Sequence, residues 1–94
     1  MPRKAVSKPK LKNVKFLFTD ECAKFVSLVG EFNGWQAGRN LMEKDRTGKF
    51  SASLKLEPGI YSYKFLADTG WKIDSNKPTV RDELGNENNQ VSVE

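Results

Sequence analysis

Two tryptophans in this 94-residue chain come immediately after turn signals. Trp35 follows Asn33-Gly34, and Trp71 follows Thr69-Gly70. A ring beside a turn is often exposed, and an exposed indole can stack on the apolar C–H face of a sugar ring, with a gross gain of about 2 to 3 kcal/mol. Tryptophan is also a common central core residue of small β-sandwiches. The sequence leaves both interpretations open for each ring.

Two further polar features could support the same chemistry. Alternation in the run 60–67 places Lys64 on the face opposite Tyr63 and Phe65, so its ammonium group is predicted to reach the outer surface. Residues 86–90 read NENNQ, and each side-chain amide offers a donor and an acceptor on adjacent atoms, which suits the paired hydroxyls of a sugar. A solvated strand lysine and an ordinary polar loop are the simpler explanations of these two features.

Catalytic chemistry has little support in the sequence. The acids that could form a glycosidase pair are Asp68, Asp74, Asp82 and Glu83, and all are predicted to lie in turns or loops, where nothing raises the pKa of a proton donor. Cys22 is the only cysteine and there is no histidine, which argues against disulfide frameworks, common zinc sites and imidazole catalysis. We therefore expect no catalytic residue, no metal site and no cofactor.

The apolar pattern that must position these residues has a period of two and is interrupted by frequent turn signals, which is typical of antiparallel strands. The run 23–29 is apolar on both faces and is predicted to be a central strand, whereas residues up to Gln90 before the last strand are predicted to form a polar loop. The pattern favours an all-β, immunoglobulin-like antiparallel sandwich of about seven strands. The predicted strands are 14–19, 23–29, 50–56, 60–67, 71–73 and 91–93.

The formal net charge of +4 is located mainly at one end of the chain. Residues 1–15 contain six basic residues and no acid, whereas the remaining 79 residues contain ten basic and twelve acidic residues. We expect residues 1–12 to form a disordered basic arm before a single domain at 13–94. Nucleic-acid binding is not favoured because no aromatic residue is interleaved with the lysines. With no apolar run of about 18 residues, no membrane partner is expected, and we predict a cytoplasmic location.

Four motifs occur in order along the chain: VGEFNGW at 29–35, PGIYSYKF at 58–65, DTGWKID at 68–74 and NKPTVRDELGNENN at 76–89. Together they resemble carbohydrate-binding module family 48, which includes the glycogen-binding domain of the AMP-activated protein kinase β subunit and the N-terminal module of glycogen branching and debranching enzymes. The resemblance covers residues 13–94.

This resemblance implies an early-set immunoglobulin-like sandwich of seven strands that binds α-1,4-linked glucose chains on one outer face. It implies that the indoles of Trp35 and Trp71 stack on glucose rings. It implies that Lys64 and Asn88 hydrogen-bond to the sugar hydroxyls. It also implies that Leu84 forms an apolar finger and that Asn86 is an extra contact. The family often has His-Asp-Pro after the second tryptophan, whereas this chain has Ile73-Asp74-Ser75.

The predicted function is therefore noncatalytic binding of an α-1,4-glucan such as glycogen, starch or maltooligosaccharides. The expected dissociation constant is on the order of 10 µM to millimolar, because two stacked rings must offset association costs. The alternative is a scaffold or regulatory module that docks a kinase or a glucan-metabolising enzyme. A third, weaker alternative is nucleic-acid binding through residues 3–15.

Overall fold

The computed structural model describes residues 11–94, which form eight β-strands and one short 3-10 turn. This bears out the predicted all-β class, with two short strands, β3 and β7, that the apolar pattern did not indicate. The elements are β1 (Lys12–Thr19), β2 (Val26–Gly30), η1 (Glu31–Asn33), β3 (Glu43–Lys44), β4 (Lys49–Leu56), β5 (Gly59–Ala67), β6 (Gly70–Lys72), β7 (Thr79–Arg81) and β8 (Glu87–Val93).

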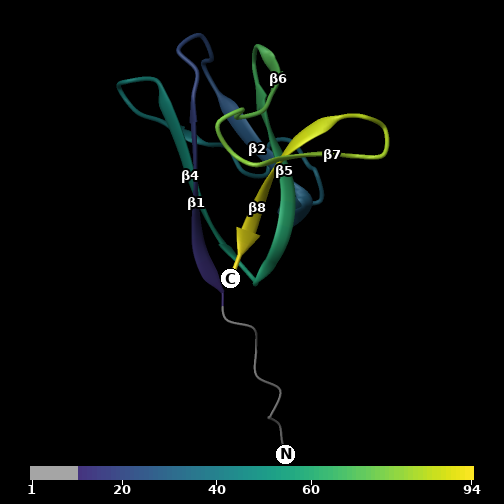
Figure 1. Ribbon diagram of the computed structural model, residues 1–94. Coiled ribbons are helices and arrows are strands. Elements are labelled where there is room, and N and C mark those ends of the chain that lie inside the picture. Colours follow the sequence, from purple (N-terminus) through teal and green to yellow (C-terminus); the bar gives the residue numbers. More distant parts are fainter. Residues whose placement is uncertain (1–10) are drawn as a thin grey trace, which may run out of the picture.

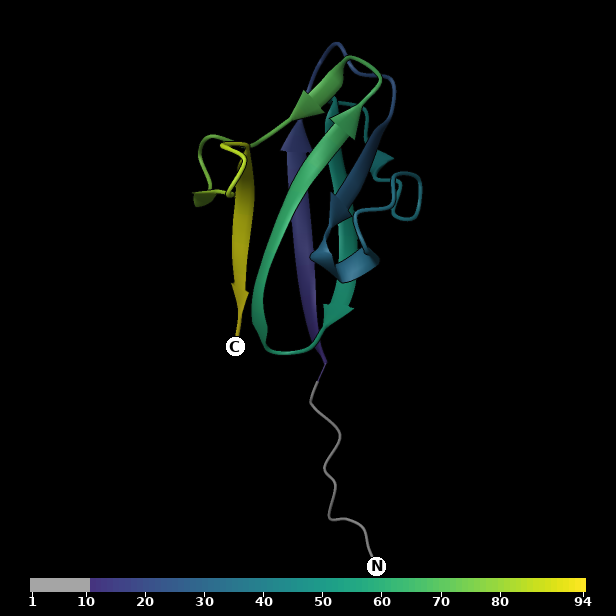
Figure 2. The ribbon, with the colours of Figure 1, turned by 90° about the vertical axis from the view of Figure 1, so that its right-hand side faces the viewer.

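The strands form two antiparallel sheets that face each other (Figures 1 and 2). One sheet has three strands in the order β1-β4-β3, and the other has the order β2-β5-β8-β7 with β6 added to β5. Strand β5 is central to the larger sheet, because β2 pairs along one of its edges while β8 and β6 share the other. The predicted β-sandwich is confirmed.

The core lies between the two sheets and is built mainly from aromatic rings. Phe16 and Phe18 of β1 and Phe50 of β4 meet Tyr63 and Phe65 of β5, and all five are buried. The rings of Phe18 and Phe65 stack with centroids 4.4 Å apart. Since side chains alternate along a strand, burying these β5 rings directs the residues between them to the outer face.

Strand β2 is not central, contrary to the prediction from its apolar pattern. It pairs with β5 on one edge, and on its other edge the backbone N–H of Leu28 donates to Asn40 O (2.8 Å) and that of Met42 donates to Val26 O (2.9 Å). The chain then continues from this covering segment into β3 of the other sheet. The crossing segment thus covers the outer edge of β2 as a neighbouring strand would.

The amide-rich segment is also different from the prediction, because most of it is strand and not loop. Residues 87–93 form β8, and β7 pairs with its first part. Asn89 is fully buried: its side-chain oxygen accepts from Asp74 N (2.7 Å), and its Nδ2 donates to Asp74 O (2.8 Å) and Pro78 O (3.2 Å). A polar residue can be buried in a strand when its hydrogen bonds are satisfied in this way.

Most of the predicted basic arm, residues 1–10, lies outside the described residues. Lys12, at the end of that predicted arm, is the first residue of β1 and pairs with Leu56. Within residues 11–94, no helix is long and apolar enough to cross a membrane.

Candidate functional site

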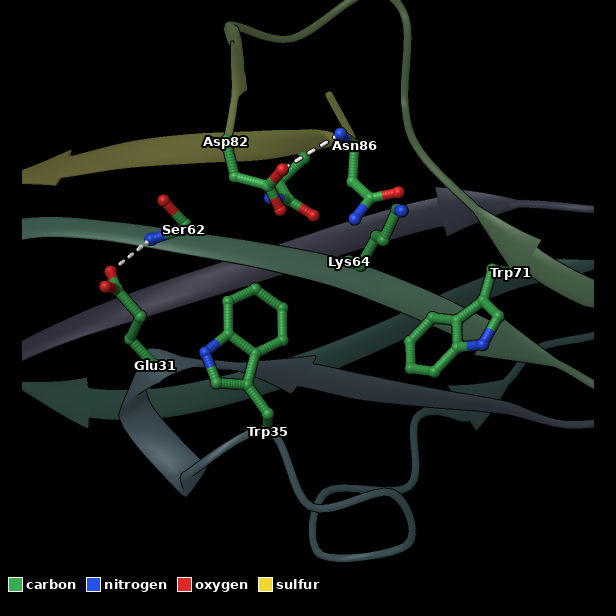
Figure 3. A pocket seen from close by; sticks show the side chains of 8 residues that line it. Glu31, Trp35, Ser62, Lys64, Trp71, Asp82 and Asn86 are labelled. Carbon is green, nitrogen blue, oxygen red and sulfur yellow. Dashed lines mark hydrogen bonds between the residues drawn. The ribbon is translucent and has the colours of Figure 1, made fainter. Parts of the chain in front are cut away.

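A hollow of about 600 Å³ lies on the outer face of the five-stranded sheet (Figure 3). It brings together five of the six site residues predicted from the sequence and adds three others. The predicted residues are Trp35, Lys64, Trp71, Asn86 and Asn88, and the additional ones are Glu31, Ser62 and Asp82.

Both indoles are exposed, which excludes the core interpretation for either ring. Trp35 is 40% exposed and Trp71 is 54% exposed. They lie on the same outer face of the five-stranded sheet with Lys64 between them, as Figure 3 shows. The two rings therefore present a pair of apolar surfaces to solvent beside a single ammonium group.

Trp35 is held in an unusual backbone conformation. Its φ is +61°, and among the described residues it is the only residue other than glycine with positive φ. Its N–H donates to Gly30 O (2.9 Å), while Gly34 before it is also left-handed, with φ of +68°. A left-handed residue with a side chain costs about 1 to 2 kcal/mol, so the surrounding structure must hold it there.

Asn33 provides much of that support. Its side-chain oxygen accepts from Gly30 N (3.1 Å), and its Nδ2 donates to Leu28 O (2.9 Å) and to Asn40 Oδ1 (2.7 Å). These bonds connect the 3-10 turn to the end of β2 and to the segment that covers β2. The Asn-Gly pair before Trp35, which the sequence indicated as a simple corner, is thus a hydrogen-bonded support for the ring.

Gly30 is required at the base of this turn because of close packing. A Cβ atom at this position would lie 2.7 Å from both Ser62 O and Tyr63 Cβ. The turn that carries Glu31 and Trp35 therefore sits directly against the backbone of β5, and this close approach brings Trp35 to the edge of the hollow.

Trp71 reaches the hollow by a different route. It follows Gly70 in the turn between β5 and β6, and it pairs with Leu66 of β5. Lys64, two residues earlier on β5, points outward as alternation predicted and is partly exposed. The central strand and its hairpin thus supply one indole and the ammonium group.

The opposite wall is formed by the turn between β7 and β8. One Asp82 carboxylate oxygen, Oδ1, accepts from Leu84 N and from Asn86 N, each at 2.9 Å. Hydrogen bonds from the Asn86 backbone and Leu84 backbone, with further bonds from the Asn86 and Asn88 side chains, lower the pKa of Asp82 below its ordinary value. The ionised carboxylate therefore shapes the turn and orients both asparagines that line the hollow.

Leu84 is the predicted site residue that does not line the hollow. It is 87% exposed at the tip of the turn closed by Asp82 and is absent from the lining residues. Its contact with a ligand stays a prediction.

Of the three lining residues that the sequence analysis did not assign to the site, Ser62 had the clearest signal. It lies two residues before Lys64 on the same face of β5, as alternation requires. Asp82 was considered there only as a catalytic acid. Glu31 belongs to the VGEFNGW motif, but its role depends on a contact with Ser62, 31 positions away, which no local pattern indicates.

The other acids and the cysteine considered for chemistry lie outside the hollow. Asp68 accepts from Lys24 N (3.0 Å), a bond between segments 44 positions apart, and Asp74 accepts from Asn76 N (3.0 Å) within a local turn, so each carboxylate has a structural hydrogen bond. Glu83 and Cys22 are exposed. Within the described part of the chain, no group of three or more histidines, cysteines or acids could hold a metal ion.

Comparison with known proteins gives a family match over nearly the whole described chain. A family described as the glycogen recognition site of AMP-activated protein kinase matches residues 12–94. The chain is 48% identical over 68 residues to Protein PTST homolog 2, chloroplastic, of Arabidopsis thaliana, and 43% identical over 68 residues to Protein FLOURY ENDOSPERM 6, chloroplastic, of Oryza sativa subsp. japonica. Each match covers 72% of this chain and 12% of the relative.

A third relative is Phosphoglucan phosphatase LSF1, chloroplastic, of Arabidopsis thaliana, which is 32% identical over 82 residues, or 86% of this chain and 14% of the relative. The chain thus corresponds to a small part of each of these three proteins. All three are chloroplast proteins by name, which contradicts the predicted cytoplasmic location.

Proposed function

The chain belongs to the glycogen-recognition family of AMP-activated protein kinase, and from this premise we propose that its hollow binds α-1,4-linked glucan without catalysing a reaction. The ligand class is starch, glycogen or their maltooligosaccharide fragments. The names of the chloroplast relatives support a plastid setting, in which the polymer would be starch.

The observation that carries this proposal is the exposure of two indoles on the same outer face of the five-stranded sheet with Lys64 between them. Stacking buries about half of an indole, which corresponds to a gross gain of about 2 to 3 kcal/mol for each ring. Association costs reduce this gain, and the expected dissociation constant is about 10 µM to millimolar. Binding of this strength localises a protein on a polymer with many repeating sites.

Polar groups around the rings match the hydroxyls of glucose. Lys64 donates, the amides of Asn86 and Asn88 donate and accept, and the carboxylates of Glu31 and Asp82 accept. Asp82 and Asn86 lie across the hollow from Trp35, whereas Glu31 lies beside Trp35 and Lys64 lies between the indoles. A chain that curves through the hollow therefore meets polar groups on both walls. We expect the bent α-1,4 chain to bind better than the straight β-1,4 chain. Leu84, exposed beside this wall, would contact the sugar from the turn.

The test is an NMR titration of the chain with maltoheptaose and, separately, with cellohexaose. Maltoheptaose should shift the indole N–H signals of Trp35 and Trp71 and the backbone amide of Lys64, whereas cellohexaose should shift them little. Equal shifts with both ligands, or no shifts with maltoheptaose, would contradict the proposal.

A second candidate function is docking of a kinase or a glucan-metabolising enzyme. It is favoured by the description of the matching family, the glycogen recognition site of AMP-activated protein kinase, which links glucan recognition to a kinase. The two functions are compatible when the hollow holds the glucan and another surface holds the enzyme. A variant that lacks both indoles should then lose glycogen in a pull-down and keep its protein partner.

A further inference from the structure

The charged groups of the hollow are unequal in number. Glu31 and Asp82 contribute two carboxylates, and Lys64 contributes the single ammonium group. From this balance we propose that the site selects neutral α-glucan and that Glu31 discriminates against chains carrying phosphate esters. This inference rests on the proposed function of the same hollow.

The carboxylate of Glu31 is fixed in place by the end of a strand. Strand β2 stops at Gly30, which pairs with Tyr63, so the N–H of Ser62 on that edge of β5 has no strand partner. Glu31 Oε1 accepts this N–H at 2.7 Å. With one oxygen anchored to the backbone, the negative charge stays at the rim of the hollow, while the second oxygen can face a ligand.

The position of Glu31 determines which part of a ligand it meets. Figure 3 shows Glu31 beside Trp35, at the end of the hollow away from Trp71, with Asp82 on the other side of β5. A glucose ring stacked on Trp35 would therefore have a carboxylate on each side. Asp82 is ionised at neutral pH, as an ordinary aspartate is, and hydrogen bonds from the turn lower its pKa further.

A phosphate monoester carries about −1.5 to −2 charges at pH 7, so it is repelled by both carboxylates. None of the eight lining residues is an arginine, the side chain best suited to bind phosphate in a bidentate manner. One lysine against two carboxylates leaves a net repulsion, and at the edge of a solvated hollow this corresponds to about a tenfold loss of affinity.

The experiment uses one preparation of maltodextrins bearing 6-phosphate groups, titrated by calorimetry before and after enzymatic removal of the phosphate. The native chain should bind the dephosphorylated sample about tenfold more tightly in a buffer of about 20 mM ionic strength. The ratio of the affinities for the dephosphorylated and phosphorylated samples should become smaller in about 500 mM NaCl, because salt screens charges at a solvated surface. This salt test needs no substitution.

The variant Glu31→Gln removes the charge and keeps an oxygen that can accept from Ser62 N. The ratio of its affinities for the dephosphorylated and phosphorylated samples should fall close to one, because Lys64 then balances the single remaining carboxylate, Asp82. Glu21→Gln is the matched control, since it makes the same charge change at an exposed position outside this hollow. Its ratio should equal that of the native chain, which separates a local effect from one of net charge.

Maltoheptaose, which carries no phosphate, reports on the proposed function alone. If it binds and the two maltodextrin samples bind equally, the inference about Glu31 is wrong and glucan binding stands. Tighter binding of the phosphorylated sample would mean that Lys64 recruits phosphate and would also overturn the inference. If maltoheptaose does not bind at all, both proposals fail.

Discussion

The two outer faces of the sandwich share the same alternation but carry different side chains. The face of the three-stranded sheet presents lysines and small polar groups, with Leu17 as its large apolar side chain. The face of the five-stranded sheet presents two indoles, an ammonium group and several amides and carboxylates around a hollow. Regular strands alone produce a solvated surface, as the first face illustrates.

The difference comes from the segments that leave the sheet. Trp35 follows the 3-10 turn after β2, Trp71 follows the β5–β6 turn, and Asn86 belongs to the β7–β8 turn. Of the predicted ligand-binding residues in the hollow, only Lys64 and Asn88 belong to the long strands β5 and β8. The strands of the five-stranded sheet therefore supply half of the residues that line the hollow, and the turns at its borders supply the other half.

The largest effect should come from removing both indoles. The double variant Trp35→Ala, Trp71→Ala loses two stacking surfaces, so affinity for maltoheptaose should fall at least a hundredfold in calorimetry. Leu17→Ala, which removes an exposed apolar side chain from the other face, is the control and should bind normally. If the double variant still bound maltoheptaose, the two indoles would not be the feature that makes one outer face a binding face.

The next effect separates two adjacent amides of β8. Asn89→Ala leaves the N–H of Asp74 without its partner and removes one of the two hydrogen bonds that Asp74 O and Pro78 O each accept, and we expect unfolding in urea to require about 2 to 4 kcal/mol less free energy. Asn88→Ala should lower glucan affinity and reduce stability by less than about 1 kcal/mol, since Asn88 lies at the hollow. If Asn88→Ala reduced stability and Asn89→Ala reduced glucan affinity, the roles of the two asparagines would have been assigned wrongly.

A smaller effect is expected for the ammonium group. Lys64→Gln removes the charge from the hollow and should weaken maltoheptaose binding about fivefold, which is near 1 kcal/mol and typical of one hydrogen bond. Lys15→Gln makes the same charge change on the three-stranded sheet and should leave binding unchanged. Equal losses in the two variants would attribute the effect to net charge.

The smallest effect concerns pH and compares two aspartates that stabilise turns in the two sheets. The pKa of Asp82 is lowered mainly by the Asn86 backbone bond, and that of Asp45 mainly by the Thr47 hydroxyl. Because the folded pKa of each is below the ordinary value of 3.8, its contribution is complete above that pH and is lost as the pH falls through the folded pKa.

Glucan affinity should therefore be constant between about pH 8 and 5 and should decrease only below the ordinary pKa of an aspartate. Asp82→Asn should weaken binding modestly at neutral pH, and Asp45→Asn should not, because Asp45 lies in the turn before β4 on the other sheet. An onset of weaker binding well above pH 5 would indicate a different titrating group.

The sequence predicted the fold class and five of the eight residues that line the hollow, and its errors have a common origin. Period-two alternation placed Lys64 outside and Phe65 inside, because pleat geometry depends only on the strand itself. The predicted central position of β2 and the predicted loop up to Gln90 were wrong, because the burial of each segment depends on partners distant in the chain. For β2 the partner is the segment around Leu41, and for Asn89 it is Asp74.

By itself the sequence determined which residues alternate, where the turns occur and which motifs link the chain to a glucan-recognition family. Only the tertiary structure decided that both indoles face solvent on the same outer face of the five-stranded sheet and that Glu31 is anchored to Ser62. Alternation is a local property of a strand, whereas the direction of a ring that follows a turn depends on what packs beneath that turn. For Trp35 this is the close contact of Gly30 with the β5 backbone.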